Sequence, residues 1–274
     1  MKILYVILLL VCVATIQIQA QSYTDYIDSS FTYIEKGELS AAEQALLKAL
    51  RTEPGNPGNV FLLSNLGTIQ RQMGKNREAL QSYNNALMMA PQSTTLLANR
   101  AALWAEIDSL QQAKDDYTRI LQIDDKNEDA IYRRGLISLE CGDTTASRLD
   151  FEWLLSINPQ SADARIGMAT LLKHRGYYLA AIELYTQVLR ANPNLGTLYL
   201  NRAEAYYYNK QYNKADDDIA TALYLSPQDP LVYVMRGKLK IARFDKEGAQ
   251  KDFDKAIELG FDANVIEDIL HGEK

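Results

Sequence analysis

Four arginines and four aspartates recur at one spacing in this sequence, and their side chains are the ones best suited to bind a charged group. Each arginine is followed 16 residues later by an aspartate. The pairs are Arg100 with Asp116, Arg134 with Asp150, Arg202 with Asp218, and Arg236 with Asp252. A planar guanidinium binds carboxylates and phosphates through two parallel hydrogen bonds, so these arginines could hold an anionic ligand. They could also be neutralised by their own aspartates.

The two positions of each pair are occupied together or not at all. Elsewhere in the chain the corresponding positions hold Ser29 with Ala45, Leu66 with Ser82, and Met168 with Leu184. Independent use of the two residue types would not produce joint presence and joint absence. We therefore predict partly buried ion pairs that stabilise the fold, in preference to a site for an anion.

No other side chain forms a recognisable chemical constellation. His174 and Cys141 have no second ligand or partner base at a metal-binding or catalytic spacing. No Gly-x-Ser-x-Gly elbow or phosphate loop occurs. The 274 residues carry 29 Lys+Arg and 35 Asp+Glu, and this acidic balance argues against a nucleic-acid partner. We expect no catalysis, no cofactor and no metal. An enzyme whose titratable groups meet only in the fold is kept as an alternative.

The elements that must position these residues repeat every 34 residues. Each repeat has a small residue, a large apolar residue four positions later and another three further on. Such spacings place the side chains on one face of a helix. The small residues are Ala79, Ala113, Ser147, Ala181, Ala215 and Ala249, and the closing prolines are Pro91, Pro159, Pro193 and Pro227.

This pattern resembles the tetratricopeptide repeat. Seven units are predicted, at residues 23–56, 60–93, 94–127, 128–161, 162–195, 196–229 and 230–263, with a capping helix at 263–271. Residues 57–59 are an insertion after the first unit. The resemblance implies an all-α fold, a right-handed α-solenoid of about seven helix pairs plus the cap. Glycine, Asp108 or Lys210 marks the turn inside six of the pairs.

In the family that the chain resembles, the first helices of the pairs line a concave groove that holds a peptide segment. Its positions, carried over unit by unit, are Asn65, Arg71, Asn99, Tyr132, Arg133, Lys173, Asn201 and Tyr207, together with Thr68, Gln72, Ala102, Glu106, Leu136, Glu140, Ile166, Thr170, His174, Leu200, Glu204 and Tyr208. The resemblance thus implies a non-catalytic protein–protein interaction scaffold. The alternative is a small-ligand or glycan receptor that uses Tyr207 and Tyr208. A single deep pocket would favour the receptor, and a shallow groove would favour the scaffold.

Residues 1–20 are predicted to be a signal peptide. Lys2 precedes an apolar run from Ile3 to Ile16, and Ala20 stands at the exit. The run has 14 residues, fewer than the roughly 20 that a membrane-spanning helix needs. We expect an exported protein, soluble in the periplasm or secreted, whose protein or peptide partner belongs to the envelope of a bacterial cell. An uncleaved membrane anchor is the alternative.

Overall fold

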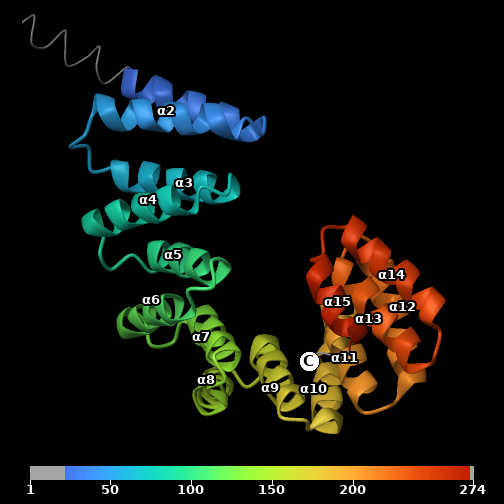
Figure 1. Cartoon of the computed structure of the whole chain (residues 1–274). Helices are drawn as coiled ribbons and strands as arrows, with labels where there is room; N and C mark the ends of the chain where they lie inside the picture. Colours follow the sequence, from blue (N-terminus) through green and yellow to red (C-terminus); the bar gives the residue numbers. More distant parts are fainter. Residues whose placement is uncertain (1–21, 272–274) are drawn as a thin grey trace, which may run out of the picture. The chain divides into compact units, whose positions relative to one another are not determined.

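The computed structural model describes residues 22–271, so the predicted signal peptide lies outside the described residues. The described chain divides between Ile137 and Ser138 into two compact units. The first unit begins with a helix at residues 22–35, called here the first helix. It continues with α2 (Leu39–Thr52), α3 (Asn59–Gln72), α4 (Asn76–Met89), α5 (Thr94–Glu106), α6 (Leu110–Ile123) and most of α7 (Glu128–Glu140) (Figure 1).

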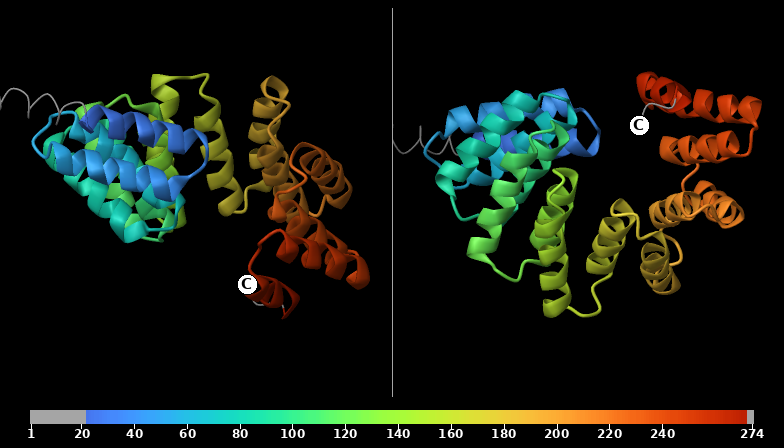
Figure 2. Two further views of the ribbon diagram at one scale, coloured as in Figure 1. Left: turned by 90° about the horizontal axis from the view of Figure 1, so that it is seen from above. Right: turned by 60° about the horizontal axis from the view of Figure 1, so that its bottom comes forward.

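The second unit takes the end of α7 and eight further helices among the described residues. These are α8 (Thr144–Ile157), α9 (Ala162–His174), α10 (Tyr178–Ala191), α11 (Gly196–Tyr208), α12 (Tyr212–Leu225), α13 (Pro230–Ala242), α14 (Lys246–Glu258) and α15 (Ala263–His271). Figure 2 shows these helices from two further directions. Helices that follow each other in sequence pack together in pairs, and no strand occurs in residues 22–271. The predicted all-α fold of paired helices with a short last helix is confirmed.

The turn inside each helix pair contains one residue with a positive φ angle. Glycine fills this position in four pairs, whereas Asp108, Lys210 and Phe244 fill it with φ of 58°, 58° and 65°. The left-handed conformation costs a residue with a Cβ atom about 1–2 kcal/mol. The turn residues predicted from the sequence all adopt it. Phe244 joins them as an unexpected member, and 91% of it is exposed to solvent.

In two of the pairs, a glycine on the first helix lies against an aromatic ring of the second helix. Tyr83 of α4 is 1% exposed, and a Cβ atom added to Gly67 of α3 would lie 2.7 Å from its ring. Gly237 of α13 meets Phe253 of α14 in the same way. The 34-residue repeat of small and aromatic residues is thus a repeat of close helix contacts.

The insertion between the first two pairs is fastened by Asn59. This residue is 2% exposed; its amide donates to the carbonyls of Glu53 at 2.7 Å and Pro54 at 3.2 Å. The Tyr23 hydroxyl of the first helix donates to its Oδ1 at 3.0 Å. One buried amide therefore joins the first helix, the loop and the start of α3.

The last helix covers the end of the array only in part. Ile266 of α15 is 2% exposed and packs against Phe253 and Ala256 of α14. Val265 and Leu270 of the same nine-residue helix remain 41% and 44% exposed. None of the described helices has the length and apolarity required to cross a bilayer.

Candidate functional site

Three of the four predicted arginine–aspartate pairs meet as two-pronged ion pairs. In each, the arginine Nε and Nη2 donate to the two oxygens of one carboxylate over 2.6–3.0 Å, and the pairs are Arg100–Asp116, Arg202–Asp218 and Arg236–Asp252. All three aspartate side chains are nearly inaccessible to solvent. The hydrogen bond to Asp218 raises the pKa of Arg202 above its ordinary value. The pairing of Arg134 with Asp150 joins residues of different units and stays a prediction.

The remaining guanidinium nitrogen reaches the second helix of the preceding pair. Arg100 Nη1 donates to Asn84 Oδ1 at 2.6 Å, and Arg202 Nη1 donates to Thr186 Oγ1 at 2.9 Å. Each of these two arginines therefore connects three helices. With their donors used inside the fold, they have little capacity left for an anionic ligand.

The second pair, which lacks the arginine and the aspartate, has a different buried network. Gln70 donates to Glu43 at 3.1 Å and accepts from Ser82 at 2.7 Å, while Lys75 donates to Glu43 at 2.6 Å. Burial alone would raise the pKa of Glu43, but the hydrogen bonds from Lys75 and Gln70 outweigh it and hold that pKa below the ordinary value. The members of this network do not recur in the other pairs, so the periodicity of the sequence gives no sign of it.

In the first unit, the predicted groove cation Arg71 is already paired. Its Nε donates to Glu106 of α5 at 2.7 Å, and this hydrogen bond lowers the pKa of Glu106. The amides of Asn65 and Asn99 are half-buried on α3 and α5. These two amides make no hydrogen bond within the described residues, so their donors and acceptors stay available.

The two predicted groove residues of α7 lie side by side in sequence but differ in exposure. Arg133 is exposed and forms an ion pair with Asp129, one turn earlier on the same helix, at 2.8 Å. Tyr132 is half-buried. The charge of Arg133 is thus already offset on its own helix.

In the second unit, the predicted positions line a hollow of about 430 Å³, called here the tyrosine pocket. Five of its lining residues are positions predicted for the groove, and two more complete it. The lining residues are Leu139, Thr170, Lys173, His174, Tyr178, Glu204 and Tyr208. Five of the carried-over positions therefore lie around one open hollow, and a partner-binding role for them stays a prediction.

A second hollow, the lysine pocket, lies next along the same inner helices. It holds about 160 Å³ and shares Glu204 with the tyrosine pocket; its walls are Leu200, Asn201, Glu204, Leu231, Val234, Met235 and Lys238. We call the surface of α9, α11 and α13 that carries both pockets the inner groove. Lys173 pairs with Glu204 and also donates to Asn201 at 3.5 Å.

Four tyrosines form one aromatic cluster at the edge of the inner groove. Tyr178 and Tyr208 stack with ring centres 5.5 Å apart, and Tyr207 meets Tyr208 edge-on at 5.3 Å. Tyr207 also lies against Tyr212 at 5.8 Å. Burial raises the pKa of the Tyr207 and Tyr208 hydroxyls. Tyr208, 46% exposed, lines the pocket, whereas Tyr207 is packed behind it and does not.

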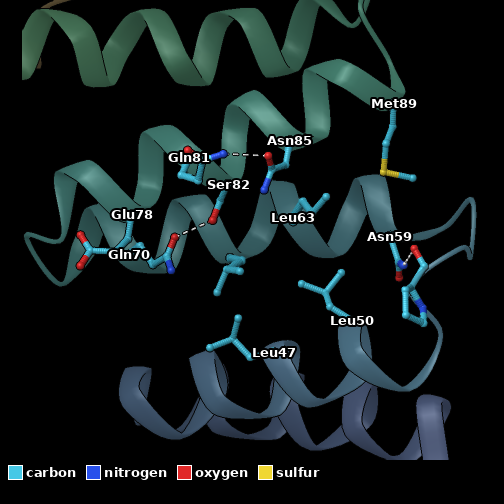
Figure 3. A pocket seen from close by; sticks show the side chains of 12 residues that line it. Leu47, Leu50, Asn59, Leu63, Gln70, Glu78, Gln81, Ser82, Asn85 and Met89 are labelled. Carbon is cyan, nitrogen blue, oxygen red and sulfur yellow. Dashed lines mark hydrogen bonds between the residues drawn. The ribbon is translucent and has the colours of Figure 1, made fainter.

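A third hollow, of about 470 Å³, lies in the first unit between α2 and α4 and above α3. Figure 3 shows Leu47 and Leu50 on one side, Met89 at one end, and Gln81 with Asn85 along the upper wall. This outer hollow is formed largely by second helices of the pairs, so the groove positions do not include it. The insertion that precedes α3 is the one sequence signal near it.

Isolated reactive side chains do not extend these sites. His174 is exposed at the rim of the tyrosine pocket, and Cys141 is a free, exposed cysteine in the turn after α7. Residues 22–271 contain no cluster of three side chains suited to holding a metal ion.

Comparisons with known proteins agree on one kind of repeat. Family models described as tetratricopeptide repeat match residues 62–95 and 196–229. A crystal structure of a tetratricopeptide repeat protein from Parabacteroides merdae is 37% identical, with a TM-score of 0.84 over 92% of this chain and 98% of that chain. The Cut9–Hcn1 structure, at 15% identity and TM-score 0.66, covers 90% of this chain and 55% of its own, and shows the fold alone.

Two curated relatives match over shorter stretches. RNA polymerase II-associated protein 3 of Xenopus tropicalis is 37% identical over 92 residues, which are 34% of this chain and 14% of that protein. The BBSome complex member BBS4 of Bos taurus is 34% identical over 99 residues, 36% of this chain and 19% of that protein. The chain thus spans less than a fifth of the length of either relative.

Proposed function

Because the chain belongs to the tetratricopeptide repeat family, whose members generally mediate protein–protein interactions, we propose that it is a non-catalytic scaffold that holds an extended segment of a partner protein in the inner groove. One observation carries this proposal: two hollows on three successive inner helices share Glu204 and follow one another. A chain-like ligand can place one side chain in each hollow and its backbone over the helix between them.

The half-buried amide of Asn201 stands between the two hollows as a backbone partner. It lines the lysine pocket and lies at 3.5 Å from Lys173, which lines the tyrosine pocket. An asparagine amide can donate to a peptide carbonyl and accept from a peptide N–H. Tyr178 and Tyr208 supply aromatic surface of the kind that is enriched at protein interfaces.

A small-ligand or glycan receptor is the second candidate, and the size of the tyrosine pocket supports it. About 430 Å³ is within the range of sites that hold small molecules. Such sites enclose most of their ligand, however, and here the space is divided between two neighbouring open hollows. A peptide segment therefore accounts for both hollows and a compact ligand for only one.

We also propose that the chain acts outside the cytoplasm, in a bacterial cell envelope. The pattern of residues 1–20 supports export, although RNA polymerase II-associated protein 3 and the BBSome complex member BBS4 are not envelope proteins. Fractionation of the native cells, with mass measurement of the mature chain, tests this. A periplasmic or secreted chain that begins near Gln21 is expected, and a cytoplasmic chain that retains its first residues would contradict export.

Photo-crosslinking from the tyrosine pocket tests the groove itself. A crosslinking residue replaces Tyr208, and a control replaces Gln250, which is exposed on α14. We expect one protein adduct at Tyr208 and none at Gln250. The adduct should disappear when Leu231→Trp fills the mouth of the lysine pocket. An adduct at both positions, or one unaffected by Leu231→Trp, would refute groove binding; an adduct with a small molecule alone would favour the receptor.

A further inference from the structure

The lysine pocket combines apolar walls with one cation that has no partner in the part of the chain that the structure describes. Leu200, Leu231, Val234 and Met235 form its walls, and the half-buried Lys238 lies at its edge. Within residues 22–271, Lys238 makes no ion pair and no hydrogen bond. The lysine pocket is therefore apolar inside and positively charged at its edge.

The other charged residue of the lysine pocket is already neutralised. Glu204 is held in an ion pair by Lys173, whose own side chain is 15% exposed. The charges of this pair offset each other at short range, so Lys238 sets the sign of the charge that a ligand meets. At physiological ionic strength, screening over about 8 Å makes this local charge more important than the acidic balance of the whole chain.

We propose, building on the function proposed above, that the inner groove selects acidic partner segments in which an aliphatic residue stands next to Asp or Glu. The aliphatic side chain enters the lysine pocket and the neighbouring carboxylate pairs with Lys238. A ring-bearing residue four positions away lies against Tyr208 in the tyrosine pocket.

The size of the lysine pocket supports a single aliphatic side chain. Its volume of about 160 Å³ equals that of roughly five water molecules in the liquid, which is too small for a complete ligand. Leu231 is 50% exposed, and an inserted side chain would cover it. Covering the pocket also removes water from Lys238, which is unfavourable unless a carboxylate replaces that water. A neutral segment leaves the cation unpaired, and a basic segment repels it.

The spacing of four residues follows from the geometry of α11. The tyrosine pocket lies on the α9 flank of this helix and the lysine pocket on its α13 flank, and a helix with its side chains is about 10 Å across. The lysine pocket uses Leu200, Asn201 and Glu204, whereas the tyrosine pocket uses Glu204 and Tyr208. The α11 residues of the two pockets differ in average position by about four residues, which is about 6 Å along the helix axis. The pockets are thus about 12 Å apart, and an extended chain spans that in about four residues at roughly 3.3 Å each. Residues separated by four point to the same side of an extended chain.

The experiment is a selection of random heptapeptides displayed against the full chain. A fluorescence anisotropy titration of a selected peptide follows, using the wild type, Lys238→Gln, Lys246→Gln and Leu231→Trp. Lys246 is the matched control, because it is an exposed lysine at the start of α14, outside the groove. Circular dichroism establishes that each variant is folded before it is titrated.

We expect selected peptides to share an aliphatic residue beside Asp or Glu, with Tyr, Phe or Trp four positions away. Replacing the acid by its amide should weaken binding to the wild type about 5- to 20-fold. The Lys238→Gln variant should bind the acidic peptide about as weakly as the wild type binds the amide version, and it should bind both peptides with the same affinity. The Lys246→Gln variant should bind both peptides as the wild type does.

Failure of this inference is distinguishable from failure of the proposed function. The inference would be overturned if the selected peptides show no preference for acidic residues and bind the Lys238→Gln variant as tightly as the wild type. If these peptides do not bind the Leu231→Trp variant, groove binding would remain supported. No binders, or binders indifferent to Leu231→Trp, would overturn both.

Discussion

Removing Asp218 or its partner Arg202 is expected to destabilise the fold by more than the contact itself contributes. The Asp218 carboxylate accepts two hydrogen bonds of 2.7 Å from Arg202, and the two side chains are only 7% and 15% exposed. Asp218→Ala leaves the Arg202 guanidinium largely excluded from water, with the Thr186 hydroxyl as an acceptor but without its carboxylate. Breaking one side of a buried pair costs about 3–5 kcal/mol.

A double-mutant cycle isolates the interaction. Arg202→Leu removes the charge and keeps an apolar stem, although it also leaves Thr186 without the donor that lies 2.9 Å away. In the double variant no buried charge is left alone. We therefore expect the double variant to be less destabilised than the sum of the single variants, with a coupling energy of about 2–4 kcal/mol.

The surface pair Glu247–Lys251 provides the matched control. Its side chains are 84% and 72% exposed and approach to 2.7 Å across one helical turn. Pairs of this type couple by about 0.3–0.5 kcal/mol. Urea unfolding followed by circular dichroism yields both cycles. Hydrogen exchange of the α11 and α12 amides locates the loss if the two compact units unfold separately. A coupling for Arg202–Asp218 no larger than that of the surface pair would refute the reasoning.

Three further changes test the packing, the turns and the buried network. Gly237→Ala should destabilise by about 1–3 kcal/mol in urea unfolding, because its Cβ would press into the Phe253 ring; Gly55→Ala, with open space around it, should stay within about 0.5 kcal/mol. Phe244→Gly should raise the melting temperature through a gain of about 1 kcal/mol, because the exposed ring stands on a left-handed residue, and an unchanged melting temperature would contradict this. The folded-state pKa of Glu43 lies below the ordinary 4.5, so its contribution to stability is present above that pH and is lost as the pH falls through the lower folded value. Unfolding measured from pH 7 to pH 3 should therefore depend less on pH in Glu43→Gln, and equal slopes would argue against the network.

Periodicity along the chain was enough to predict the helices and their pairing. A small residue followed by large apolar ones at four and three positions defines a helix face from local geometry alone. The same periodicity located the turns, because the left-handed position favours residues such as Gly142. The left-handed conformation of Phe244 was not predicted, because phenylalanine is not a residue type that favours a positive φ. The joint presence of the arginines and aspartates in the sequence was enough to predict contacts such as Arg202–Asp218.

Tertiary structure decided which groove side chains are free to bind a partner. Arg71 and Lys173 look like free cations in the sequence, yet each pairs with an acid on the next inner helix, 35 and 31 residues later. Within residues 22–271 Lys238 has no such partner, and it lies beside apolar walls that come from α11 and α13. The spacing of residues along one helix follows from the local sequence. Which acid lies opposite a given lysine or arginine on the next inner helix depends instead on how the two helix pairs pack. That packing leaves the charge at Lys238 available for a ligand, and no repeat in the sequence could have indicated it.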